Sequence, residues 1–102
     1  MTCPRVDIVD FADESFPGFV HCGFTDANGN RHTVLEKIPV VTTGDLWRDS
    51  TYPQPGTLPC ERVECLHDSA GRALALVSIN PIGPGYPAQF MVLESQLVND
   101  CW

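Results

Sequence analysis

The sequence predicts an all-β fold: a small antiparallel barrel or two-sheet roll, SH3-like or OB-like, with about five or six short strands. Two tight hairpins with glycine-containing turns, over residues 19–37 and 58–79, are the first observation. The second is the even spread of 9 prolines and 8 glycines, which interrupts long helices and leaves long loops. A barrel or roll is favoured because both leave few exposed sheet edges.

The chain has 102 residues, a length that predicts a single domain over residues 1–102 with one hydrophobic core. Hydrophobic residues make up 43% of it and charged residues 19%, which is typical of a folded globular domain and not of a disordered one.

The net charge is −7, with Lys37 as the only lysine and no cluster of arginines. We therefore expect no binding to nucleic acid, and binding to anionic membranes is disfavoured. Both kinds of binding need clustered basic side chains. The first ten residues lack the apolar run of a signal peptide, so the predicted location is cytoplasmic. The 5 cysteines are then expected to be reduced thiols that behave mainly as small buried hydrophobes.

The first element expected is an edge strand around Val6, Ile8 and Val9, followed by an acidic loop over residues 10–14. The acidic side chains of this region lack the ligand spacing and turn glycine of a calcium loop. They are interpreted as a solvated face.

The first hairpin is expected between residues 19–25 and residues 31–37, joined by an Asn28-Gly29 turn. Val20, Cys22 and Phe24 alternate on one strand face and predict a buried side. On the returning strand either Val34 or Leu35 reaches the core, since adjacent residues face opposite ways.

Residues 42–57 form the longest irregular region, in which Thr42 or Thr43 is expected to cap a helical turn over residues 44–47. Such a long loop in a small domain is usually functional or folded over the core. After a second loop over residues 80–87, the last strand is expected at residues 89–94. Its apolar residues lie on both faces, which predicts a central strand or one closed into a barrel.

The second hairpin is the strongest local signal. Its turn contains Asp68, which can bond its own backbone, and Gly71, which can adopt a positive φ. The apolar run over residues 74–79 predicts a central strand. Together with the first hairpin and the last strand, this gives a predicted core of Val20, Cys22, Phe24, Val63, Cys65, Leu74, Leu76, Phe90 and Val92, with Val34 or Leu35.

No catalytic residue, metal ligand or cofactor is predicted. The candidates considered for zinc are Cys60, Cys65 and His67, with His21 and Cys22 on another strand. A C-x4-C spacing on a regular strand points its two thiols to opposite faces, unless a bulge intervenes, so convergence is not expected. Glu61 and Glu64 fall on opposite faces for the same reason, which disfavours an acid–base pair.

The loop aromatics and prolines are the predicted partner-binding residues: Trp47, Tyr52, Pro53, Pro55 and Tyr86. Rigid amphipathic loops of this composition are enriched at interaction sites. The alternative is that Trp47 and Tyr52 fold back as a lid over one end of the barrel, which is favoured for Trp47 because Leu46 beside it also needs burial.

The leading functional hypothesis is a non-catalytic protein-interaction module whose acidity attracts a basic protein partner. A small-ligand-binding barrel is the alternative, with Tyr52 and Tyr86 at its mouth. A small metal- or cysteine-dependent enzyme is third, since the sequence has no phosphate loop or nucleophile elbow.

Three segments, residues 36–41 (EKIPVV), 52–56 (YPQPG) and 68–72 (DSAGR), resemble a pattern shared by small uncharacterised bacterial all-β proteins of unknown function. The resemblance covers residues 19–97. It implies a bacterial, stand-alone, cytoplasmic domain, and it implies no activity and no site residue.

Overall fold

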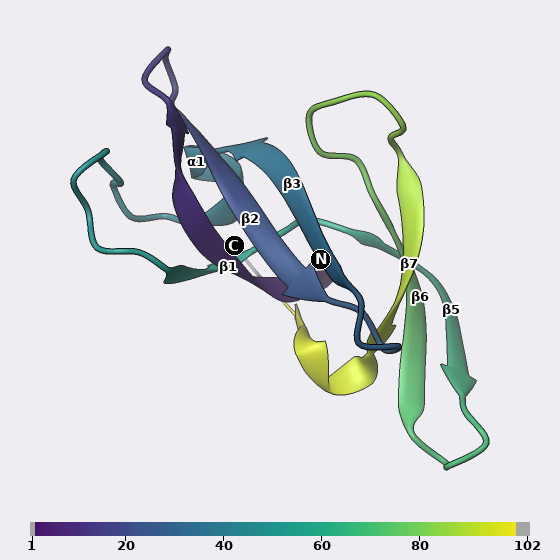
Figure 1. The fold of residues 1–102 in the computed structure, drawn as a ribbon. Helices are drawn as coiled ribbons and strands as arrows, with labels where there is room; N and C mark the ends of the chain where they lie inside the picture. The colour runs from purple at the N-terminus through teal and green to yellow at the C-terminus, as the bar shows by residue number, and fades with distance from the viewer. Residues whose placement is uncertain (1, 100–102) are drawn as a thin grey trace.

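The structure is a computed structural model that describes residues 2–99. In that range the chain is almost entirely strand and loop, which confirms the all-β class (Figure 1). In chain order the elements are β1 (Thr2–Asp13), β2 (Phe19–Thr25), β3 (Arg31–Lys37), α1 (Ile38–Val41), β4 (Gln54–Thr57), β5 (Glu61–His67), β6 (Ala73–Ile79), β7 (Ala88–Leu93), the 3-10 helix η1 (Glu94–Gln96) and β8 (Leu97–Asn99).

The larger sheet has the strand order β3-β2-β1-β4, and β8 also pairs with β1. All of its pairings are antiparallel. β1 is therefore the central strand and not the predicted edge strand, and it continues through the expected acidic loop to Asp13. Val6 and Ile8 are buried while Arg5 and Asp7 are exposed, so one face of β1 supplies core and the other meets solvent.

The smaller sheet has the order β5-β6-β7. Both predicted hairpins are confirmed, as β2 pairs with β3 and β5 with β6. In the β5–β6 turn, the Asp68 carboxylate accepts hydrogen bonds from the amides of Ala70 and Arg72, and Gly71 has a φ of 83°. β7 is an edge strand of this sheet, so the expectation of a central last strand is wrong.

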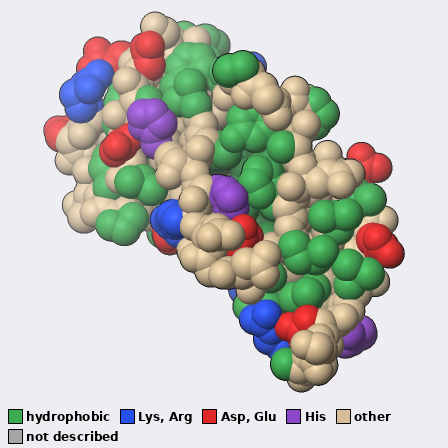
Figure 2. Space-filling view, turned by 45° about the vertical axis from the view of Figure 1, so that its right-hand side comes forward, with side chains coloured by type: hydrophobic (Ala, Val, Ile, Leu, Met, Phe, Trp, Pro, Cys, Tyr) green, Lys and Arg blue, Asp and Glu red, His purple; other side chains and the backbone are tan. Residues whose placement is uncertain are grey.

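The two sheets meet through β6 and β7, whose Ala75, Val77, Ile79 and Val92 join the core cluster. At the β2–β3 turn, the Ala27 amide donates to the Met91 carbonyl at 2.8 Å. The described strands do not close into a barrel, and the molecule measures 44 × 26 × 25 Å, an elongation that Figure 2 shows.

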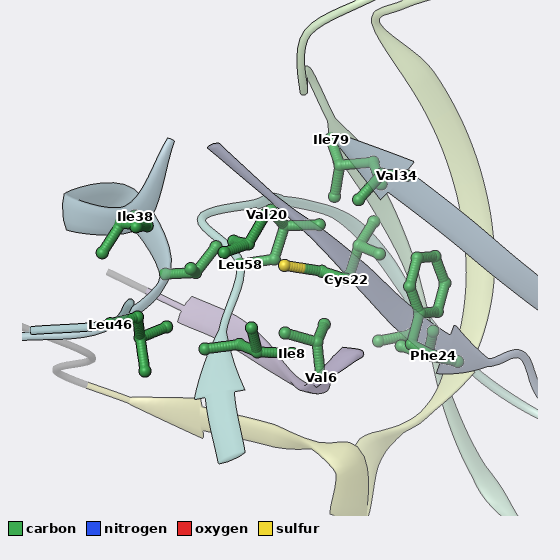
Figure 3. Packing of buried hydrophobic residues seen from close by; sticks show 14 residues of the cluster. Val6, Ile8, Val20, Cys22, Phe24, Val34, Ile38, Leu46, Leu58 and Ile79 are labelled. Atoms are coloured by element: carbon green, nitrogen blue, oxygen red, sulfur yellow. The ribbon is translucent and has the colours of Figure 1, made fainter. Parts of the chain in front are cut away.

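The core lies on one face of the larger sheet, under α1 and the loop that follows it (Figure 3). Six predicted core residues are buried: Val20, Cys22, Phe24, Val34, Leu74 and Val92.

Four predicted core residues are not buried. Val63 is 48% exposed and Cys65 is exposed, because β5 is an edge strand whose register shifts between Arg62 and Glu64. Leu76 is half-buried because it alternates with the inward-facing Ala75 and Val77 on β6. Phe90 is half-buried and packs against the edge of the cluster.

The helical turn lies earlier than expected. α1 begins directly after β3 with Pro39 in its first turn, and it ends where the Thr42 amide donates to the Ile38 carbonyl at 3.1 Å. Thr42 thus closes the helix instead of starting one, and the predicted turn over residues 44–47 is wrong.

Cys3 is disulfide-bonded, so the expectation that all cysteines are reduced is wrong for this residue. Disulfides persist mainly in oxidising compartments, and this observation counts against the cytoplasmic location, which stays a prediction. Neither helix of residues 2–99 is long and apolar enough to cross a membrane.

Candidate functional site

Two loops enclose a groove at the end of the larger sheet where β1 turns into β2. We call it the aromatic groove; its volume is about 510 Å³. Its apolar lining comprises Phe11, Phe16, Pro17, Ile38, Leu46 and Trp47. Its charged lining comprises Glu14, Asp45 and Arg48.

The β1–β2 loop carries Phe16, whose side chain is 97% exposed. The Ser15 amide donates to the Asp13 carboxylate at 2.7 Å, and the Gly18 amide donates to the Ser15 carbonyl at 2.6 Å. Gly18 has a φ of 90°, which favours glycine, and its carbonyl accepts the Ile38 amide at 3.0 Å. These bonds form a tight turn anchored to α1, so the exposure of Phe16 follows from an ordered loop.

The α1–β4 loop carries Trp47, which is 65% exposed while its neighbour Leu46 is 6% exposed. The Trp47 amide donates to the Ser50 hydroxyl at 2.9 Å. The Trp47 carbonyl accepts the Ser50 amide at 3.1 Å and the Tyr52 hydroxyl at 2.6 Å. The backbone is thus fixed while the indole faces solvent, so Leu46 covers the core and the lid interpretation of Trp47 is wrong.

The five predicted binding residues do not form one surface. Trp47 and Tyr52 are joined by a hydrogen bond, and Pro53 beside them is exposed. Tyr52 itself packs against the core cluster, as a lid would. Pro55 is exposed on β4, next to a different cavity.

Tyr86 also packs against the core, but from the β6–β7 loop. Figure 1 shows this loop well apart from the α1–β4 loop. The sequence interpretation missed Phe16, although its Phe-Pro-Gly loop shows the same combination of aromatic and proline that drew attention to Trp47 and Tyr52.

Carboxylates outnumber basic groups at the groove and next to it. Among the lining residues, Glu14 and Asp45 are acidic and Arg48 is basic and pairs with Glu14, while Asp13 and Asp49 are sequence neighbours of the lining. Hydrogen bonds from the Ser15 amide and hydroxyl lower the pKa of Asp13.

A second cavity, of about 620 Å³, extends over part of the larger sheet. Arg5, Asp7, Gly23 and Arg31 are among its lining residues. The Arg31 guanidinium lies over Gly23, where a Cβ would clash with its Nη2 atom, and it pairs with Asp7 at 3.1 Å. Tyr52 and Tyr86 line neither of these two cavities.

Two histidine–aspartate pairs are found within residues 2–99. His21 Nδ1 lies 2.6 Å from Asp10 at the exposed surface. His32 Nε2 lies 2.8 Å from Asp26, and the His32 ring centroid lies 4.7 Å from that of Phe90, at the junction of the two sheets. The second pair thus supports the packing of one sheet on the other.

The cysteines and histidines considered for zinc do not converge. No group of three potential metal-ligating side chains occurs within residues 2–99. Cys22 is fully buried in the core, where burial, with the Glu36 carboxylate nearby, raises its pKa to about 12. Cys65 lies exposed on β5 and accepts a hydrogen bond from Arg62 at 3.3 Å. Burial also raises the pKa of Cys60.

Comparison of the chain with protein-family models, with curated proteins and with solved structures finds no match. The chemistry of the described side chains is therefore the basis for assigning a function. Among these side chains, Phe16 and Trp47 are the most exposed large hydrophobic residues, and both line the same groove.

Proposed function

We propose that the chain is a non-catalytic protein-interaction module that binds a basic protein partner through the aromatic groove. The observation that carries this proposal is the exposure of Phe16 and Trp47, at 97% and 65%, on two loops that line one groove. Removing a side chain of this kind from water contributes about 1.5–3 kcal/mol, so a partner that covers both rings gains substantial free energy.

Hydrogen bonds hold the backbones of the two groove loops in place, and this supports binding. The Trp47 backbone is held by Ser50 and Tyr52, and Gly18 anchors the Phe16 loop to α1. Binding then requires little further ordering of the loops, which lowers its entropic cost. Tryptophan is one of the residue types enriched at the few positions that dominate interface energetics.

The charge of the chain supports a basic partner. The net charge is −7, and the groove loops contain more carboxylates than basic groups. Complementary charge raises association rates and selects among partners, and its effect falls as salt screens it. The partner is thus expected to present a positive surface with apolar side chains at its centre.

A small-ligand site is the alternative, favoured by the second cavity. Arg5 and Arg31 both line it, against one carboxylate, Asp7, which pairs with Arg31, so an anionic ligand is the charge it would suit. The barrel mouth expected between Tyr52 and Tyr86 does not support this alternative, because the sheets stay open and both rings lie against the core.

The proposal is tested by capture on immobilised wild-type protein and on a Phe16→Ala/Trp47→Ala variant, using extract of the source cells. Val63→Ala/Ile82→Ala is the matched control, since it removes two exposed apolar side chains that do not line the groove. We expect the wild type and the control to retain the same protein and the groove variant to lose it. With the purified partner, titration calorimetry should show at least about tenfold weaker binding to the groove variant and weaker binding at high salt.

A partner retained equally by the groove variant would contradict the role of the groove. If no protein is retained, while a small anion co-purifies and raises the melting temperature, the second cavity is the functional site. Melting temperatures of the three proteins, measured first, establish that each is folded.

A further inference from the structure

The aromatic groove already contains a guanidinium group that belongs to the chain itself. The Arg48 Cζ atom lies 5.2 Å from the centroid of the Phe11 ring. The Arg48 Nε atom donates a 2.9 Å hydrogen bond to Glu14 Oε1. All three residues line the groove. The Arg48 guanidinium therefore contacts both the Phe11 ring and the Glu14 carboxylate there.

The contact of Arg48 with Phe11 and Glu14 can be replaced by a contact with another guanidinium group. The Arg48 and Glu14 side chains are 60% and 71% exposed, and an exposed ion pair of this kind is weak. Asp45 also lines the groove and Asp49 follows Arg48 in the loop, so carboxylates are close by for a displaced Arg48 side chain. The structure thus shows a site for a guanidinium whose present occupant is loosely held.

We infer that the groove binds a protein segment that carries an arginine next to an apolar residue, an inference that rests on the proposed interaction function. The arginine of the partner replaces Arg48 between Phe11 and Glu14, and the apolar residue packs between Phe16 and Trp47. Arginine suits this site better than lysine because its planar group stacks on a ring and bonds a carboxylate at once. Arg48 is then an internal competitor that lowers the affinity for the partner.

The test uses a random heptapeptide phage library selected on the wild-type chain, followed by binding measurements with the most enriched peptide carrying a fluorescein label. We expect arginine at a fixed position in the selected peptides. Fluorescence anisotropy should show at least about threefold tighter binding to Arg48→Gln, which corresponds to about 0.65 kcal/mol. Glu14→Gln should bind at least about threefold more weakly and lose the preference for the arginine peptide over its lysine analogue.

Matched charge controls separate this effect from net charge. Arg72→Gln removes one positive charge at the distant β5–β6 turn, and Glu64→Gln removes one negative charge on β5. Neither should change the affinity by the factors seen for the groove variants. The role of Arg48 is overturned if Arg48→Gln binds the peptide with unchanged or lower affinity than the wild type. It is also overturned if Arg72→Gln raises the affinity as much as Arg48→Gln does.

The outcomes also distinguish the inference from the function on which it rests. Selected peptides that lack a fixed arginine, yet lose binding to Phe16→Ala/Trp47→Ala, overturn the inference and leave the interaction function standing. If no selected peptide depends on Phe16 and Trp47, both are overturned.

Discussion

The hydroxyl of Tyr52 donates a 2.6 Å hydrogen bond to the backbone carbonyl of Trp47, so a ring that packs against the core positions a ring that faces solvent. The sequence predicts that both residues belong to one binding surface, and the structure gives them different roles. Tyr52 supports the loop, while Trp47 presents its indole.

Tyr52→Phe is expected to lower the free energy of unfolding by about 1 kcal/mol, because it removes this hydrogen bond and keeps the ring. Peptide binding to the groove should weaken as well, since the Trp47 loop is then less ordered. Urea denaturation and fluorescence anisotropy measure the two effects. Tyr86→Phe is the control, as no such bond is seen for Tyr86 among the described residues; equal losses in both variants would contradict the role of Tyr52.

Ile79→Ala is expected to cost about 2–5 kcal/mol of unfolding free energy, because Ile79 is 1% exposed in the core. Leu76→Ala, on the same strand, should cost clearly less, since its half-buried side chain already meets water. Equilibrium denaturation in urea compares them. A larger loss for Leu76→Ala would mean that the opposite face of β6 is covered in solution.

Asp26→Asn is expected to reduce the acid sensitivity of the fold. The hydrogen bond from His32 is the main cause that lowers the Asp26 pKa, and the Asn30 and Asn28 amides add to it. A pKa that is lower in the folded state stabilises the fold above the unfolded value of about 4, and this stability is lost as the pH falls through the folded value.

The unfolding free energy of the wild type should therefore fall as the pH drops below about 4. The variant should start lower at neutral pH and fall less steeply. Some slope remains, because hydrogen bonds from Arg72 lower the Asp68 pKa in the same way. Asp45→Asn, whose carboxylate makes no turn hydrogen bonds among the described residues, is the control; a slope for Asp26→Asn equal to the control's would refute the role of Asp26.

The cysteines are expected to react with iodoacetamide at different rates. Cys65 is exposed and should be modified first, and the half-buried Cys60 with its raised pKa should follow. Cys22 should stay unmodified near pH 8, because a pKa of about 12 and full burial leave almost no accessible thiolate. Peptide mass spectrometry locates the label, and denatured protein is the control in which Cys22 must react.

Local features could be predicted from the sequence, whereas long-range pairing could not. The two hairpins depend on turns such as Asp68 to Gly71, whose chemistry lies within a few residues. The central place of β1 depends on partners that are distant in the sequence, such as Gly56 opposite Val6. A strand pattern shows which side chains alternate and does not show which strand lies beside it.

The candidate site was predicted in part for a similar reason. For an aromatic residue in a proline-containing loop, the sequence leaves open an exposed surface or a lid, and it favours the lid for Trp47, whose side chain is exposed in the structure. Which rings point outward depends on the packing of neighbouring side chains. Leu46 is buried in the core and the adjacent Trp47 is exposed, while Tyr52 and Tyr86 pack against the core. On β6 the run of apolar residues on both faces made Leu76 indistinguishable from Val77.

The pairing of β1 also has a consequence for biosynthesis. β1 leaves the ribosome before two of its partner strands, because Val6 pairs with Gly56 on β4 and Cys3 pairs with Val98 on β8, and both partners come later in the chain. Until both have emerged, the inward face of β1, with Val6 and Ile8, has no sheet to complete its burial, although the β2–β3 hairpin can already form. Assembly that depends on such distant contacts is slow and exposes apolar surface to aggregation. The nascent chain is therefore expected to rely on chaperones for longer than a protein whose neighbouring strands pair in sequence order.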